Sequence, residues 1–163
     1  MWHDMQYLQE KVFPFLDLEY MLTEFFKRLL KAGKFSLARN YLKGTGPFSL
    51  ASEKAENLVI QAAREYFFFS ASSLTCSEIW KAKECLKLFP GGRNVKAEAV
   101  VIDVFTIKLP ELGVTLLPMQ CRQIKDPMEI IKRAITSRAG AYLQVDELIE
   151  IAKWHSYSKG SMQ

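Results

Sequence analysis

Cysteine and histidine side chains, from which nucleophilic and metal sites are often built, are few in this chain of 163 residues. Three cysteines and two histidines occur: Cys76, Cys85, Cys121, His3 and His155. A cysteine nucleophile needs a neighbouring base, and both histidines lie near an end of the chain. No C-x-x-C pair, H-E-x-x-H, G-x-S-x-G or P-loop pattern occurs. We therefore expect no metal, no cofactor and no enzymatic activity, and a reducing compartment.

A group of polar side chains lies in the stretch LLPMQCRQIKDPMEII, residues 116–131. Arg122 and Lys125 suit an acidic partner, while Gln120 and Gln123 could hydrogen-bond the loop backbone. The alternative is that the segment only satisfies its own amides and the start of the next helix. We expect a connection between helices, in which Arg122, Gln123 and Lys125 are the best local candidates for protein contact.

Three consecutive aromatic residues, Phe67, Phe68 and Phe69, cannot all face one core if they lie on a helix. One interpretation is that one of them, with Phe68 as the candidate, contacts a partner or a following helix. The favoured interpretation is a crowded helix end wrapped by its neighbours, with Trp80 and Phe89 providing the cover. Cys85 is expected to fill the core rather than to react.

The charge balance argues against nucleic acid as the main partner. The net charge is +4, but 22 basic residues are answered by 18 acidic ones along the whole chain. A nucleic-acid-binding protein usually gathers its positive charge on one element. No segment has the roughly 18 apolar residues of a membrane helix, and the opening MWHDMQ lacks the basic start of a secretory signal. Any membrane association is expected to be peripheral.

Apolar residues recur at spacings of three and four, which predicts amphipathic helices. We expect them at about residues 18–32, 36–42, 53–67, 76–89, 95–110, 127–139 and 145–153. Helix-capping roles are assigned to Asp17, Gly33, Thr75, Asn94, Asp126 and Gly140, with Glu78 and Glu129 as the acids of capping boxes that begin at Thr75 and Asp126. The expected buried residues of the last two helices are Met128, Ile130, Ile131, Ala134, Ile135, Leu148, Ile149 and Ala152.

The segment VVIDVFTI, residues 100–107, is rich in β-branched residues and would also suit a buried strand. Helical spacing and the absence of another convincing strand favour a helix. About seven helices therefore predict an all-α fold. From periodicity alone it is either a closed bundle or an open α-solenoid of stacked antiparallel helices.

Four stretches, LFPGGRN, KLPELGVTLLP, RQIKDPMEII and GAYLQVDELIE, resemble the neuroblastoma-amplified sequence family, and its plant members in particular. The similarity is strongest over residues 62–153 and continues more weakly back to about Lys31. The resemblance implies an α-solenoid, with residues 1–153 belonging to a helical secretory-pathway domain. Residues 154–163 depart from the pattern and are expected to form a divergent tail.

The resemblance also implies a function. Members of this family act in a Dsl-type tethering complex on the cytosolic face of the endoplasmic reticulum, which captures vesicles returning from the Golgi. The family subunit is a scaffold that joins another tether subunit and a SNARE protein, with no small-molecule substrate. Animal members are also linked to nonsense-mediated mRNA decay, so a nucleic-acid-associated adaptor is the alternative expectation.

Overall fold

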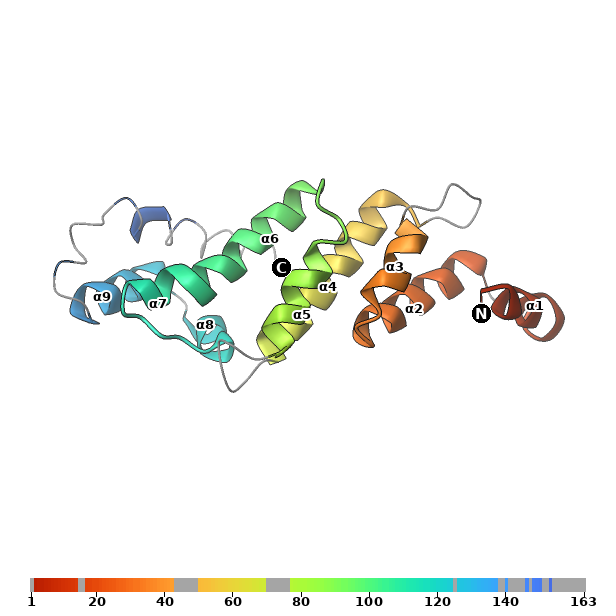
Figure 1. Cartoon of the computed structure of the whole chain (residues 1–163), viewed down its shortest axis with the longest axis horizontal. Coiled ribbons are helices and arrows are strands. Elements are labelled where there is room, and N and C mark those ends of the chain that lie inside the picture. Colours follow the sequence, from red (N-terminus) through yellow and green to blue (C-terminus); the bar gives the residue numbers. More distant parts are fainter. Residues whose placement is uncertain are drawn as a thin grey trace.

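The helices are stacked in a row along the long axis of the molecule (Figure 1). The computed structural model describes residues 2–14, 17–42, 50–69, 77–124, 126–137, 140, 146, 148–150 and 153. In chain order the elements are α1 (Trp2–Val12), α2 (Leu18–Lys31), α3 (Phe35–Leu42), α4 (Ser52–Phe69), α5 (Ser77–Leu86), α6 (Arg93–Asp103), the π-helix η1 (Val104–Lys108), α7 (Leu109–Glu111), α8 (Pro118–Gln123) and α9 (Pro127–Ser137). Every regular element in these ranges is helical, which confirms the predicted all-α class.

The stack is built around α4, which lies at its middle (Figure 1). This helix contacts α2, α5, α6 and α8, and its contact with α5 is the most extensive of any pair of elements described. Val59 and Ala63 are fully buried on it. Small side chains such as Ala62 and Ala63 allow two helix axes to approach closely. The buried apolar side chains of the described residues form one cluster that extends from α2 to α9.

The ends of α2 follow the expectation from sequence. The Asp17 carboxylate accepts a hydrogen bond from the backbone N–H of Glu19 at 3.4 Å. At the other end Gly33 has φ +67°, and the Lys34 N–H donates to the Leu29 carbonyl at 2.9 Å. Glycine adopts this left-handed conformation without the steric penalty of a Cβ atom. The chain can therefore reverse direction into α3.

The β-branched segment is helical, as predicted, but it contains a π turn. The Leu109 N–H donates to the Val104 carbonyl, five residues back, in η1. Pro110 follows and has no N–H to continue the ordinary ladder. The Thr106 hydroxyl donates to the Ile102 carbonyl at 2.8 Å. Phe105 of η1 is buried, and its ring lies 6.2 Å from that of Phe67.

Several expectations about elements are wrong. Residues 2–12 form α1, which the sequence did not predict. The expected connection between residues 110 and 125 contains the short helix α8. The helix expected over residues 76–89 ends at Leu86. Beyond it, the N–H groups of Leu88 and Phe89 donate to the carbonyls of Cys85 and Leu86 in a turn. The predicted Thr75 cap, most of 145–153 and the tail 154–163 lie outside the described residues.

The expected burial of the last two helices is also partly wrong. Ile130, Ala134 and Leu148 are buried, but Met128, Ile135 and Ile149 are exposed, and Ala152 lies outside the described residues. At 100° per residue, Met128 and Ile135 lie about 140–160° around α9 from Ile130. A stripe that includes all three residues is too wide to face one neighbouring layer.

The N-terminus of α6 is capped from another helix rather than by Asn94. Gly92 is the N-cap residue. The Glu56 carboxylate, from α4, accepts hydrogen bonds from the N–H groups of Asn94 at 3.1 Å and Val95 at 3.4 Å. A carboxylate at this position also interacts favourably with the helix dipole. A Cβ atom at Gly92 would lie 2.6 Å from Glu56 Oε1, so the capping side chain would have to shift if another residue stood there.

Replacing Glu56 with alanine should lower the free energy of unfolding by about 1 kcal/mol, because two helix N–H groups lose their acceptor. Urea unfolding followed by circular dichroism would measure this loss. Glu53→Ala is the matched control, since Glu53 is exposed on the same helix one turn earlier. An equal effect of the two substitutions would contradict the capping role.

Candidate protein-binding surfaces

Part of the stretch with Arg122, Gln123 and Lys125 forms helix α8. Gln123 ends this helix and its side chain is exposed. The backbone of Arg122 belongs to α8, but its side chain lies outside the described residues, as does all of Lys125. Ile124 is buried at 4% exposure and holds the segment to the core. The structure therefore places Gln123 at the surface, and contact by Arg122 and Lys125 stays a prediction.

Local hydrogen bonds explain why α8 forms. Pro118 occupies the first turn, where a missing N–H is harmless. The Gln120 side-chain oxygen accepts from the backbone N–H of Leu117 at 2.9 Å, so the expected bond from this glutamine to the backbone is confirmed. Proline followed two residues later by glutamine is a helix-start pattern that could have revealed α8.

The start of α9 also follows the prediction. The Asp126 carboxylate accepts from the N–H of Met128 at 2.9 Å, and Pro127 is the first helical residue. Glu129, which was expected in a capping box, accepts instead from the Arg133 guanidinium at 2.6 Å. The polar groups of this stretch thus include several with a structural role.

Phe68 lies at the end of α4, on the edge of the core. Phe67 is buried, and the two rings form an edge-on contact with 5.3 Å between centroids. The Phe68 side chain is half-buried and packs against the core, as does that of Phe89. Nothing is described of the Phe69 side chain. A partner contact by Phe68 stays a prediction, made through the accessible part of its side chain.

Trp80 does not wrap this cluster, contrary to expectation. It is 61% exposed on α5, whereas Ile79 and Ala82 of the same helix are buried. Trp80 is offset from the buried stripe of α5, which continues through Cys85 and Leu86. Helical phase within α5 could have identified Trp80 as a surface residue.

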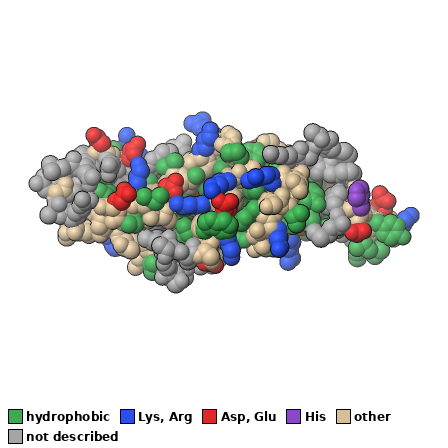
Figure 2. Space-filling view, viewed as in Figure 1, with side chains coloured by type: hydrophobic (Ala, Val, Ile, Leu, Met, Phe, Trp, Pro, Cys, Tyr) green, Lys and Arg blue, Asp and Glu red, His purple; other side chains and the backbone are tan. Residues whose placement is uncertain are grey.

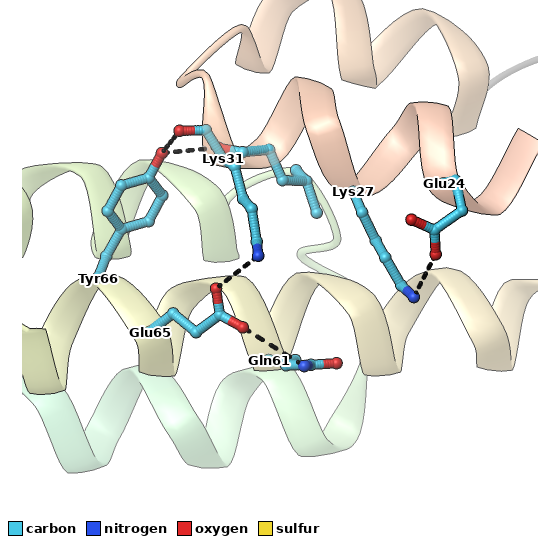
Figure 3. A network of polar contacts seen from close by, with 7 residues as sticks. Glu24, Lys27, Lys31, Gln61, Glu65 and Tyr66 are labelled. Atoms are coloured by element: carbon cyan, nitrogen blue, oxygen red, sulfur yellow. Dashed lines mark hydrogen bonds and ion pairs between the residues drawn. The ribbon is translucent and has the colours of Figure 1, made fainter.

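A network of polar side chains joins α2 and α4 (Figure 3). The Tyr66 hydroxyl lies 2.7 Å from the Leu30 carbonyl and 2.9 Å from the Lys31 carbonyl. Lys31 pairs with Glu65 at 3.7 Å. Burial raises the pKa of Tyr66, so its hydroxyl remains a donor at neutral pH. This network fastens the end of α2 to α4.

A shallow cavity of about 190 Å³ lies beside the network, with Glu24, Lys27, Leu30, Lys31, Leu58, Gln61, Ala62 and Glu65 around it. Pockets for small ligands usually measure about 300–1,000 Å³ and have mostly apolar walls. The Lys27 ammonium lies 2.7 Å from Glu24 and, through this hydrogen bond, lowers the pKa of that carboxyl. Opposite charges here neutralise each other, so the cavity is better explained as a seam between helices.

The described residues form neither a metal-binding cluster nor a membrane-spanning helix. No group of three or more histidine, cysteine, aspartate or glutamate side chains there is placed to hold a metal ion. Among the same residues, no helix is both long and apolar enough to cross a membrane.

The described helices define an all-α protein of stacked helices as the class that this geometry fits. Residues 3–158 match the family described as secretory pathway protein Sec39. The chain therefore belongs to the Sec39 family, and the resemblance to the neuroblastoma-amplified sequence family is confirmed.

Two relatives indicate how the chain compares with longer proteins. It is 66% identical over 153 residues to MAG2-interacting protein 2 of Arabidopsis thaliana, an alignment covering 94% of this chain and 6% of that protein. It is 32% identical over 111 residues to the human NBAS subunit of the NRZ tethering complex, covering 68% of this chain and 5% of that protein. No solved structure matches. The chain thus spans a small fraction of these relatives.

Proposed function

We propose that this chain is a non-enzymatic helical scaffold of a vesicle-tethering complex that acts in transport from the Golgi to the endoplasmic reticulum. The observation that carries the proposal is the Sec39 family match over nearly the whole chain. The similarity to a human protein described as a tethering-complex subunit supports it. The stacked helices suit such a role, since they offer extended surfaces.

The proposed partners are another tether subunit and an endoplasmic-reticulum SNARE protein. The chain would then be cytoplasmic and associate with the cytosolic face of that membrane through its partners. We propose residues 1–153 as part of the scaffold domain and 154–163 as a divergent tail. Arg122, Gln123, Lys125 and Phe68 are the proposed contact residues.

Affinity capture with the tagged chain should recover tether subunits or an endoplasmic-reticulum SNARE from cell lysate. The Arg122→Glu/Lys125→Glu double variant should recover at least about 10-fold less, because reversing interfacial charges replaces attraction with repulsion. Quantitative mass spectrometry of the captured proteins would measure both results.

Lys132→Glu is the matched control, because Lys132 is an exposed cation on α9 outside the proposed contact. Circular dichroism should give the same helix content for all variants. Recovery of chaperones alone would contradict the scaffold function, and recovery of RNA-decay factors would favour the adaptor alternative. Equal recovery by both charge variants would contradict only the assignment of the contact residues.

A further inference from the structure

The outer face of α5 carries an aromatic side chain that the fold does not use. Trp80 is 61% exposed, the highest exposure of any described tryptophan, phenylalanine or leucine side chain. Tryptophan is enriched among the residues that dominate binding energy at protein interfaces. An exposed tryptophan on a well-packed helix is held in place by the core beneath it, here Ile79 and Ala82. It is therefore a preformed apolar anchor.

Positive charge lies two helical turns further along the same face. Lys83 and Lys87 follow Trp80 by three and seven residues, which places them on the same side of α5 and its terminal turn. The Lys87 N–H still donates to the Lys83 carbonyl, so the helical path continues to Lys87. A rise of about 1.5 Å per residue puts the Lys87 backbone roughly 10 Å from that of Trp80.

The basic character continues into the first turn of α6. Residues 87–97 contain Lys87, Arg93 and Lys96 and no acidic residue. Arg93 and Lys96 are exposed, and no carboxylate pairs with either among the residues that the structure describes. Figure 2 shows lysine and arginine side chains in a row across the middle of the visible face, with acidic side chains among them and hydrophobic ones beside them. Along the chain, the apolar anchor at Trp80 is therefore followed by positive charge that is only partly neutralised.

We propose that Trp80, Lys87, Arg93 and Lys96, here called the α5 surface, bind an acidic amphipathic segment of a partner protein. An apolar side chain of that segment packs on Trp80, and its carboxylates lie about two helical turns further along, against the cations. The inference rests on the proposed scaffold function and specifies the chemistry of one partner.

Neighbouring ion pairs favour a peptide over a nucleic acid. Asp103 lies 2.7 Å from Lys83, and Glu84 pairs with Lys87. These carboxylates would repel a continuous line of phosphates, whereas a peptide can place its few acidic groups beside the cations at the start of α6. Charge complementarity of this kind sets specificity and association rate, while the tryptophan contact supplies most of the affinity.

The test is selection of phage-displayed 16-residue peptides on the full chain, followed by fluorescence anisotropy of the selected peptides. The peptides should be acidic and contain an aromatic or large aliphatic residue. Trp80→Ala should weaken their binding at least about 30-fold. Arg93→Gln/Lys96→Gln should weaken it about 10-fold at low salt, with a smaller effect at high salt. Each cation is replaced with glutamine rather than glutamate, because the Glu56 carboxylate already lies at this helix end and a second one beside it would repel it.

The controls are Tyr20→Ala and Lys132→Gln, which remove an exposed aromatic ring on α2 and an exposed cation on α9. Neither should change binding. Selected peptides that are neutral or basic, or that bind Trp80→Ala as well as the original chain, would overturn the inference. The inference would also be overturned if a 20-nucleotide single-stranded RNA bound the chain more tightly than the selected peptides and lost this binding in Arg93→Gln/Lys96→Gln. If Trp80→Ala captured tether subunits at unchanged yield, the α5 surface would not be their binding site. The inference would then be wrong, and the proposed function would still stand.

Discussion

Replacing Arg64 with alanine should lower the free energy of unfolding by about 3–5 kcal/mol, because it leaves the Glu98 carboxylate buried without its partner. Arg64 of α4 donates two hydrogen bonds to Glu98 of α6, from Nε to Oε1 at 2.9 Å and from Nη2 to Oε2 at 2.7 Å. The two side chains are only 19% and 11% exposed. Urea unfolding followed by circular dichroism would measure the loss.

The control for this prediction is another ion pair that joins two helices. Lys83 and Asp103 connect α5 to α6 at 2.7 Å, but their side chains are 33% and 52% exposed. Lys83→Ala should therefore lower the free energy of unfolding by about 1 kcal/mol or less. The double variant Arg64→Met/Glu98→Leu should recover most of the lost stability, since two apolar groups need no ionic partner. An Arg64→Ala effect no larger than that of Lys83→Ala would refute the buried-pair argument.

Alkylation of Cys85 by iodoacetamide at pH 8 should be at least about 100-fold slower in the folded chain than in urea. The side chain is fully buried, and its Sγ lies 3.5 Å from the Val59 carbonyl. Burial raises the pKa of the thiol to about 12 from 9.0, which lowers the thiolate fraction at pH 8 about a thousandfold. Mass spectrometry of a Cys76→Ser/Cys121→Ser variant would follow Cys85 alone.

Adding Ser36→Cys to that variant provides the control, because residue 36 is exposed on α3. Its thiol should react at nearly the same rate with and without urea.

The raised pKa of Cys85 also predicts that stability depends on pH. The unfolded thiol loses its proton near pH 9 and the folded one only near pH 12. This contribution to stability is complete below pH 9 and is lost as the pH rises toward 12. Cys85→Ala should lack that part of the alkaline destabilisation. The alkylation prediction would be contradicted if Cys85 reacted equally fast with and without urea.

Local pattern was sufficient for elements whose signals lie within a few residues of each other. Asp17 and Gly33 bracket α2, and Asp126 begins α9, because a cap is a bond between a side chain and the adjacent turn. Cys85 was placed correctly in the core because it falls on a regular apolar stripe. The all-α class followed from many such stripes.

Features that depend on distant contacts could not be predicted from local pattern. Asn94 was assigned as the cap of α6, but the acceptor is Glu56, 38 residues earlier in the chain. α1 was missed because much of its apolar surface, including Tyr7, Leu8 and Val12, is exposed rather than packed in a stripe. Secondary structure was therefore easier to predict than the binding surface.

The two adjacent glycines before α6 differ in how freely evolution can replace them. A Cβ atom at Gly91 would meet nothing within 4 Å, whereas one at Gly92 would lie 2.6 Å from Glu56 Oε1 and 3.0 Å from Phe89 Cδ1. The backbone at Gly92 has φ −69°, which any residue adopts. The constraint there is therefore space, and it is shared with the side chain that caps α6. Position 91 should therefore tolerate substitution by itself, whereas substitutions at positions 92 and 56 should occur together.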